Sequence, residues 1–440
     1  MAQHFRRYDP KQALLLPPSL DDWLPAGHLA RFIADTVEEL DIGPFFKKYK
    51  EREDGRGHVA FHPKLMLKVL IYAYSVGIFS SRKIAQGVDD LVALRFLAAG
   101  DRPSHRTYAR FRQENLERFK ALFAQVVRIA AESGLVKMGT LAIDGTKLKA
   151  NASRHKAMSY GRMSEEEKRL KDEIQRITRM AQEQDQEEDG TFGPDFRGDE
   201  LPEELQRRES RLKVIREAKE RLEKEQAEQD EAQERGEYHE ETGRGKVKRP
   251  NGVPPDKKQA NFTDPDSRIM GNPKVGFVQG YNGQFAVDAE AQIIVANRVT
   301  QCAADNGELV AMTKKAIEIV GCVPQKLLAD AGYRSEQGFA ELEDLGVDAH
   351  IPLGRGEDGP SRQRQTGPAT KRMHKKRQTK RSRTLYKKRK AIVEPVFGWI
   401  KAVLGFRSFS LRGLKQAEGE WDLVCLALNL KRMATRLEWI

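Results

Sequence analysis

Three acidic residues lie in sequence contexts where a carboxylate can do chemistry. Asp144 follows an apolar stretch in LAIDGTKLKA (141–150), Asp330 ends the apolar stretch QKLLAD, and Glu394 lies in YKKRKAIVEPVFGWIK (386–401). A carboxylate at the end of a buried strand is costly unless it is paired or holds a cation. Asp-Gly also ends many strands simply to form a turn. Asp144 alone is therefore either a turn residue or a catalytic group, and the two later acidic residues favour catalysis.

The chemistry that three such carboxylates can share is phosphoryl transfer. Two divalent cations held by carboxylates can activate an attacking hydroxyl and stabilise a leaving oxygen. Hard carboxylate ligands without sulfur favour two Mg²⁺ ions, with Mn²⁺ as a substitute. The alternative for Glu394 is a carboxylate that only caps a helix ahead of Pro395. The cysteines have no zinc-ligand spacing, so we expect no structural zinc site.

The elements that must position these carboxylates are strands alternating with helices. Residues 275–301 predict two or three antiparallel strands, and residues 305–320 predict a helix. A strand with Asp144, antiparallel strands, a helix, a strand with Asp330 and a helix with Glu394 follow the order of an RNase H-like core. The predicted fold class is therefore α/β, with a mixed sheet flanked by helices.

An all-helical region precedes this core. Apolar spacing predicts helices over residues 63–79, 80–100 and 104–133. The turn GDRPSH between the last two resembles a helix-turn-helix. Arg106 and Arg110 lie four residues apart and so share a face that could meet DNA phosphates or bases. A solvated face of a helical bundle would show the same pattern.

The charge of the chain favours a polyanionic partner. The 440 residues carry a formal net charge of +12, and nucleic acid is the commonest such partner. Residues 359–393 contain 14 Lys or Arg residues and no Asp or Glu. This run has no periodicity, which predicts a flexible segment that follows the DNA backbone. The N-terminus has no signal-peptide core and no apolar run is long enough to cross a bilayer, so we expect a cytoplasmic, nucleoid-associated protein without a membrane partner.

An acidic segment interrupts the predicted core. Residues 164–234 are about one-third Asp or Glu, with narrow apolar stripes that predict an antiparallel helical hairpin. Residues 235–258 are rich in Gly, Pro and Lys and predict a flexible linker. The predicted domains are a helical DNA-binding domain (1–135), a catalytic domain (136–154 and 259–440) and the hairpin insertion with its linker (155–258).

Three stretches together resemble a DDE transposase of a bacterial insertion sequence: IDGTKLKANAS (143–153), LLADAGY (327–333) and residues 386–401. The last resembles the Tyr-Arg-Glu-Lys signature of one large group of these enzymes. The resemblance covers most of the chain and stops at the acidic hairpin. It implies that the catalytic residues, which also bind the metal ions, are Asp144, Asp330 and Glu394.

The same resemblance implies DNA-contacting residues around the last carboxylate. These candidates are Lys147, Tyr386, Arg389, Lys390 and Lys401, in addition to Arg106 and Arg110 of the N-terminal region. The signature usually has three residues between its arginine and its glutamate, whereas four separate Arg389 from Glu394. Lys390 has the expected spacing, so both remain candidates for the signature basic residue.

The function implied by the resemblance is Mg²⁺-dependent transposition. The enzyme would bind the terminal inverted repeats of its element, cleave double-stranded DNA at the ends and join them to target DNA. Because two ends must be held together, we expect a homodimer. Two alternatives remain: a catalytically silent DNA-binding protein of transposase descent, and a structure-specific nuclease without strand transfer.

Overall fold

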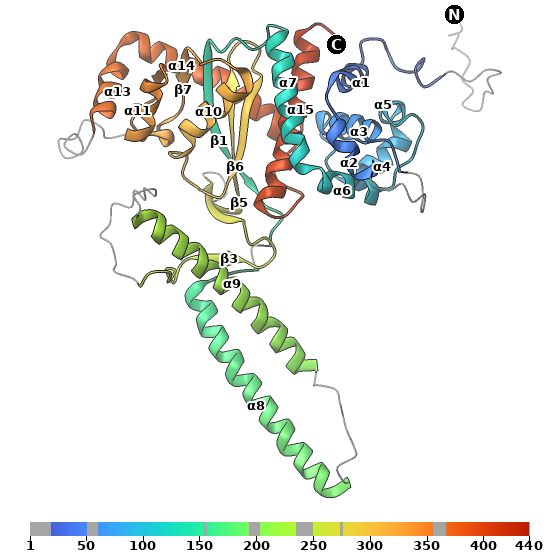
Figure 1. The fold of residues 1–440 in the computed structure, drawn as a ribbon, viewed down its shortest axis with the longest axis vertical. Coiled ribbons are helices and arrows are strands. Elements are labelled where there is room, and N and C mark those ends of the chain that lie inside the picture. The colour runs from blue at the N-terminus through green and yellow to red at the C-terminus, as the bar shows by residue number, and fades with distance from the viewer. Residues whose placement is uncertain are drawn as a thin grey trace, which may run out of the picture.

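A six-stranded sheet forms the centre of the molecule (Figure 1). The computed structural model describes residues 19–50, 60–153, 156–192, 203–234, 250–272, 276–354 and 367–439. The strands of the sheet are β1 (Thr140–Lys149), β4 (Arg268–Asn272), β5 (Gly276–Asp288), β6 (Ile294–Thr300), β7 (Lys326–Leu328) and β8 (Asp348–His350).

The strand order β4-β5-β1-β7-β8, with β6 also paired to β5, is that of an RNase H-like core. β1 pairs antiparallel with β5 and parallel with β7, and β7 pairs parallel with β8. β5 and β6 are joined by a short turn, which antiparallel strands allow, whereas the parallel strands are reached through helical crossovers. The predicted fold class is confirmed.

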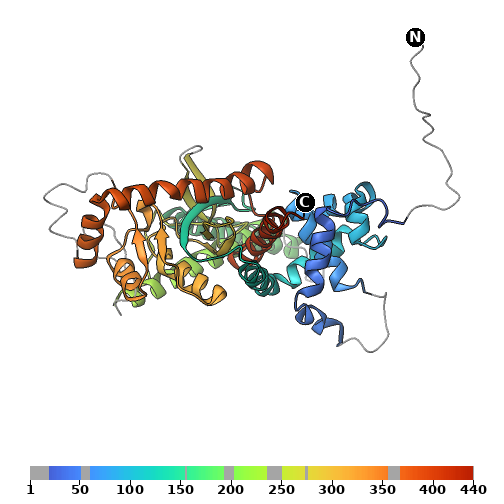
Figure 2. The same ribbon diagram turned by 90° about the horizontal axis from the view of Figure 1, so that it is seen from above.

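Helices cover both faces of the sheet, as Figure 2 shows for the long helix that crosses one face and the shorter helices below it. The helices and helical turns of this region are α10 (Glu308–Val320), η2 (Ala331–Tyr333), α11 (Glu336–Asp344), α13 (Pro368–Gln378), α14 (Lys380–Gly398), the π-helix η3 (Trp399–Val403) and α15 (Leu414–Arg436). None of the helices in the described part of the chain is long and apolar enough to cross a membrane.

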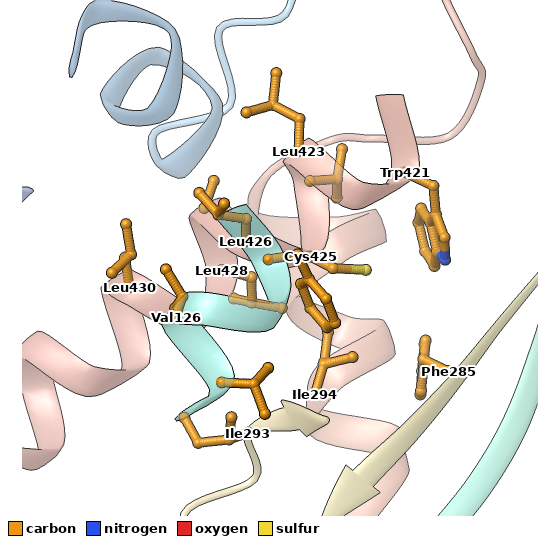
Figure 3. Packing of buried hydrophobic residues seen from close by; sticks show 14 of the residues in the cluster. Val126, Phe285, Ile293, Ile294, Trp421, Leu423, Cys425, Leu426, Leu428 and Leu430 are labelled. Carbon is orange, nitrogen blue, oxygen red and sulfur yellow. The ribbon is translucent and has the colours of Figure 1, made fainter. Parts of the chain in front are cut away.

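The C-terminal helix α15 is the centre of the hydrophobic core. Its apolar residues are buried on every side, against α7 and α3 of the N-terminal region and against β6 of the sheet (Figure 3). Trp421 is fully buried and donates a hydrogen bond to the carbonyl oxygen of Gln284. The buried side chains of the N-terminal helices and those of the sheet consequently form one continuous cluster.

The N-terminal region contains more and shorter helices than the sequence predicts: α1 (Leu29–Glu39), α2 (Gly43–Lys50), α3 (Pro63–Ser75), α4 (Ser81–Asp90), α5 (Val92–Leu97), α6 (His105–Glu114) and α7 (Leu116–Glu132). The helix predicted over 104–133 is wrong in one respect, because it breaks at Asn115. The buried Asn115 side chain donates to the Phe111 carbonyl oxygen at 2.7 Å, a local bond that competes with the regular helix. The helix predicted over 80–100 breaks likewise, at Leu91.

The acidic segment forms two long helices, α8 (Tyr160–Phe192) and α9 (Glu203–Glu234), which project from the body as an antiparallel pair (Figure 1). They pack through a small cluster of their own that includes Leu170, Leu212, Ile215 and Leu222. At their base, β2 (Ala157–Ser159) pairs antiparallel with β3 (Gln259–Asn261), so the chain enters and leaves the hairpin at one place. Most of the predicted linker, residues 235–249, lies outside the described residues.

The prediction of a flexible basic segment is wrong for the residues described. From residue 368 onward the run forms α13 and most of α14, while residues 359–366 lie outside the described part. Lys and Arg are good helix formers, and buried residues such as Ala369, Met373 and Val393 attach the two helices to the core. These apolar residues are too few to give a visible periodicity in so charged a sequence.

Pro395 lies inside α14 without ending it. Proline has no N–H, so the Ala391 carbonyl oxygen one turn earlier loses its helical donor. The Gln292 side-chain amide, from the turn between β5 and β6, donates to that oxygen at 2.8 Å. The defect is therefore repaired by a tertiary contact, and the helix continues to Gly398 before it widens into η3.

Candidate active site

The sheet brings two of the three predicted carboxylates to adjacent strands. β1 and β7 run parallel, with Ala142 opposite Leu328. Two residues further along each chain, Asp144 and Asp330 follow. Asp330 begins the helical turn η2, where its Oδ1 accepts a hydrogen bond from the Gly332 N–H at 2.8 Å. β7 ends just before Asp330, as predicted, whereas β1 does not end at Asp144 but continues to Lys149 against β5. Both aspartates lie just beyond the point where the parallel pairing of β1 and β7 stops, and we call this place the sheet edge.

Asp144 is a half-buried carboxylate held by a cation. Its side chain is 16% exposed, and its Oδ2 accepts a hydrogen bond from Arg389 Nη1 at 2.6 Å. Its Oδ1 accepts from the Gly145 N–H at 2.9 Å. Burial raises the pKa of Asp144 to about 6, repulsion by Asp330 acts in the same direction, and the attraction of Arg389 opposes both. A pair of carboxylates that repel each other in a partly buried site is a place where a cation stabilises the charge.

Glu394 does not join the two aspartates in this structure. Its side chain is exposed on α14, where the neighbouring Val393 and Val396 turn inward to the core. Within the described ranges, no group of three or more His, Cys, Asp or Glu residues could hold a metal ion. The carboxylates of Asp144 and Asp330 nevertheless match the hard oxygen ligands that Mg²⁺ prefers, so two of the three predicted ligands fit the ion.

Arg389 rather than Lys390 reaches the site. Arg389 is 13% exposed and contacts Asp144, whereas Lys390 is exposed on the outer side of α14. The guanidinium of Arg389 lies 5.8 Å from the ring centroid of Tyr386, and the guanidinium of Arg377 lies 4.5 Å from the same centroid. Lys401 donates a hydrogen bond to the Thr146 hydroxyl. Three of the signature residues are therefore gathered beside β1.

Lys147 lies on the opposite face of the sheet from Asp144. Side chains alternate along a strand, so Gly145 and Lys147 face away from α14. There the Asp305 Oδ1 accepts hydrogen bonds from Lys147 Nζ at 3.2 Å, Asn282 Nδ2 at 2.6 Å and Gln284 Nε2 at 2.7 Å. The Tyr333 hydroxyl in turn donates to Gln284 Oε1. We call the network of Asp305, Lys147, Asn282, Gln284 and Tyr333 the Asp305 brace. Burial raises the pKa of Tyr333, which keeps the hydroxyl protonated as a donor.

The Asp305 brace explains the glycine that follows Asp144, whereas the glycine that follows Asp330 is explained by Asp330 itself. A Cβ on Gly145 would meet the Gln284 amide and would lie 3.0 Å from Asp305 Oδ1. A Cβ on Gly332 would lie 3.0 Å from Asp330 Oδ1 and 3.5 Å from Asp305 Oδ2. The brace therefore packs tightly against the backbone that follows Asp144. Sequence reasoning missed Asp305, which looks like an ordinary acidic residue ahead of a helix.

The arginines of α6 face in two directions. Arg106 and Arg110 are exposed, which both a DNA-contacting helix and a solvated helix face would show. Arg112 is buried and donates from Nη1 to the Tyr74 hydroxyl at 2.7 Å and to the Phe79 carbonyl oxygen at 3.0 Å. It also lies 3.8 Å from Glu420 of α15, so α6 is anchored to the central helix.

Several residues of the basic run are paired within the protein. Arg372 forms hydrogen bonds with Glu343 of α11, and Lys376 forms an ion pair with Asp348 of β8. Arg377 donates to the Ser382 carbonyl oxygen at 2.8 Å. Some of the basic residues that the sequence predicts to contact DNA therefore also hold α13 and α14 in place. Lys371, Lys375, Lys380 and Arg381 are exposed.

Comparisons with known proteins agree with this architecture. Residues 252–430 match the family described as "Transposase DDE domain", and residues 18–114 match the family described as "Transposase domain (DUF772)". The first match contains Asp330 and Glu394 and begins after β1, so Asp144 lies outside it. No curated protein and no solved structure matches the chain.

Proposed function

Because the chain belongs to the DDE transposases of insertion sequences, we propose that it binds the terminal inverted repeats of its element, cleaves the DNA there and joins the ends to target DNA. The observation that carries the proposal is the pair of aspartates, Asp144 and Asp330, side by side at one edge of an RNase H-like sheet. Their mutual repulsion makes this edge a natural site for a divalent cation.

In this proposal Asp144 and Asp330 hold Mg²⁺, with Mn²⁺ as a substitute, and Glu394 is the third ligand. The ions supply Lewis acidity for phosphoryl transfer when they are bound. Arg389 is bonded to an oxygen of Asp144 that a metal ion would use, so this ion pair has to open when the ion binds, and Glu394 has to turn toward the site. The released guanidinium then offers its planar donors to a DNA phosphate, which is the geometry that arginine recognises well. Lys401, beside Thr146, adds a second positive charge next to the reacting strand.

The remaining parts of the proposal concern DNA and assembly. Arg106 and Arg110, exposed on α6, would read the element ends, and the exposed basic residues of α13 and α14 would contact the backbone. Lys147 remains a DNA-contact candidate, although it is paired with Asp305 in this structure. A homodimer would hold two ends together. We retain residues 1–135 as the DNA-binding domain, 136–154 with 259–440 as the catalytic domain and 155–258 as the insertion.

The test is an assay of purified protein with Mg²⁺ and labelled duplexes taken from the DNA that flanks the gene. A joined product supports transposition. Cleavage without joining would indicate a structure-specific nuclease. A mobility shift without cleavage, in Mg²⁺ and in Mn²⁺, would overturn the catalytic part of the proposal and leave DNA binding.

One observation favours a second candidate, a DNA-binding protein of transposase descent that does not cut. Arg389 donates a hydrogen bond to the Asp144 carboxylate, and Glu394 is exposed. A protein that does not cut DNA would also show this arrangement. The two candidates differ in metal binding. We titrate the protein with Mn²⁺ and follow bound ions by electron paramagnetic resonance. An active site should bind Mn²⁺ in the wild type and lose it in Asp330→Asn, whereas a silent protein should bind no Mn²⁺ that depends on Asp330.

A further inference from the structure

A basic pocket lies between the end of α14 and the last turns of α15. Its cavity of about 240 Å³ is lined by the cations Lys431, Arg432 and Arg436, together with Trp399 and Gln292. No carboxylate occurs among the described residues that line it. Trp399 is 36% exposed and follows Glu394 by little more than one helical turn. We call this cavity the α14–α15 pocket.

The helices that form the pocket lie on the same face of the sheet as Asp144. Asp144 pairs with Phe285 across β1 and β5, so their side chains share a face. Phe397 of α14 and Trp421 of α15 both contact the Phe285 ring, at 4.5 and 6.4 Å between centroids. The two helices that form the pocket therefore cover the face of the sheet that carries Asp144.

The cations of the pocket are held without acidic partners. Lys431 donates to the Ser75 carbonyl oxygen at 3.1 Å and lies 4.9 Å from the centroid of the Trp399 ring. Arg432 donates from Nη1 to Gln292 Oε1 at 2.7 Å, and its buried Nε has no hydrogen-bond partner in the part of the chain that the structure describes. Among the residues that the structure describes, none forms a salt bridge with Lys431, Arg432 or Arg436.

Arg432 is kept charged at the expense of stability. Burial lowers its pKa to about 10, and repulsion from Arg436 adds to the effect. A base whose pKa is lowered by folding holds its proton less well in the native state, so its charge opposes folding at neutral pH. Proteins tolerate such a cost where a side chain serves binding. An anion bound in the pocket would offset this charge.

We propose that the α14–α15 pocket binds a phosphate of a DNA strand, with the exposed part of Trp399 against the adjoining sugar or base. The proposal rests on the proposed function and adds a contact site to it. A guanidinium such as that of Arg432 or Arg436 presents planar donors that match a phosphate, and an indole offers a surface on which a nucleotide can stack. This pairing of cations with an aromatic ring favours a nucleic acid strand over free phosphate.

The test compares the variants Arg432→Met and Arg436→Met with the control Lys415→Met. Lys415 lies at the other end of α15, 70% exposed and paired with Glu117, so the control removes the same charge from the same helix. A random-sequence duplex is titrated at several salt concentrations. Each pocket variant should bind about tenfold more weakly and flatten log K against log salt by about 0.9. Arg432→Met should melt at the same temperature as the wild type or higher, and the control should change neither affinity nor slope.

Three results would overturn the proposal. If the control weakens binding as much as the pocket variants, net charge alone is responsible. If both pocket variants bind like the wild type, the pocket holds no phosphate, although the proposed function survives. If the wild type binds no DNA at all, the proposed function fails as well. Arg436→Met keeps the test valid if Arg432→Met melts early, because Arg436 is exposed at the end of the helix.

Discussion

The sheet edge that carries Asp144 and Asp330 and the hairpin of α8 and α9 hold their charges in opposite ways. At the sheet edge, Asp144 is paired with Arg389, 245 residues away, and Asp305 with Lys147, 158 residues away. In the hairpin, Glu167 pairs with Lys171 one turn along the same helix and with Lys219 on the facing one. Long-range pairs need the whole sheet to form, whereas the pairs of the hairpin need only two helices.

This difference means that the charges at the sheet edge serve the proposed activity, whereas those of the hairpin stabilise local structure. Charges at the sheet edge are half-buried and partly repulsive, so they weaken the fold unless a ligand compensates them. The hairpin has a small apolar cluster and a solvated surface of complementary charges, which stabilise it locally. We therefore expect changes at the sheet edge to remove activity while the fold survives. Changes in the hairpin should alter local structure and leave activity in place.

The largest effect is expected from the carboxylates themselves. Asp144→Asn, Asp330→Asn and Glu394→Gln should each lower DNA cleavage by about a thousandfold or more, because each removes a ligand charge. Binding of end DNA should persist, since no large contact surface is lost. The exposed Glu318→Gln on α10 is the control for a lost surface charge. Near-normal cleavage by any one variant would remove that residue from the triad.

The next effect concerns the Asp305 brace. Asp305→Asn keeps an oxygen that can accept hydrogen bonds but removes the negative charge that pairs with Lys147 and strengthens the bonds from Asn282 and Gln284. Cleavage should fall by about ten- to a hundredfold, and the Mg²⁺ concentration for half-maximal rate should rise, while DNA binding stays unchanged. Asp344→Asn, an exposed aspartate at the end of α11, is the control. An unaltered Mg²⁺ requirement would mean that the brace does not position the two aspartates proposed to bind metal.

A smaller, local effect is expected in the hairpin at low pH. Hydrogen bonds from Lys171, Lys219 and Arg216 lower the pKa of Glu167 to about 2, and burial opposes them. Because the folded-state pKa is lowered, the ionised side chain stabilises the hairpin above the unfolded-state pKa of 4.5, and this contribution is lost as the pH falls from there toward 2. Far-UV circular dichroism of Glu167→Gln should show less acid-induced loss of helix than the wild type. Identical acid titrations would assign the loss to other carboxylates.

The smallest effect on activity is expected from removing the hairpin altogether. A short turn in place of residues 161–257 keeps the β2–β3 pair, because the Tyr160 N–H and the Lys258 carbonyl oxygen are already 2.8 Å apart. The shortened protein should melt cooperatively and cleave DNA at a rate within about threefold of the wild type, although it loses the pair between Glu225 and Arg268. Aggregation or non-cooperative melting would show that the hairpin belongs to the core.

Much of the candidate site could be predicted because its signals are local. A buried strand followed by an acidic residue and a nearby glycine identified Asp144 and Asp330, and the order of elements identified the RNase H-like sheet, which the structure confirms. The hairpin could also be predicted, from its apolar stripes with helical spacing and its high content of charged residues. The metal-ligand roles of the three carboxylates stay predictions.

Sequence by itself thus determined most strands of the sheet, though not β4 or the β2–β3 pair, most helices and the residues from which the site is built. Tertiary structure decided which side chains meet. Helical rotation brings Arg389 to Asp144 and leaves Glu394 outside, while alternation along β1 sends Lys147 to the opposite face. The basic run is helical because a few buried residues pack against the core, and Gln292 repairs the break at Pro395. Such contacts join residues far apart in the chain, so no local pattern contains them.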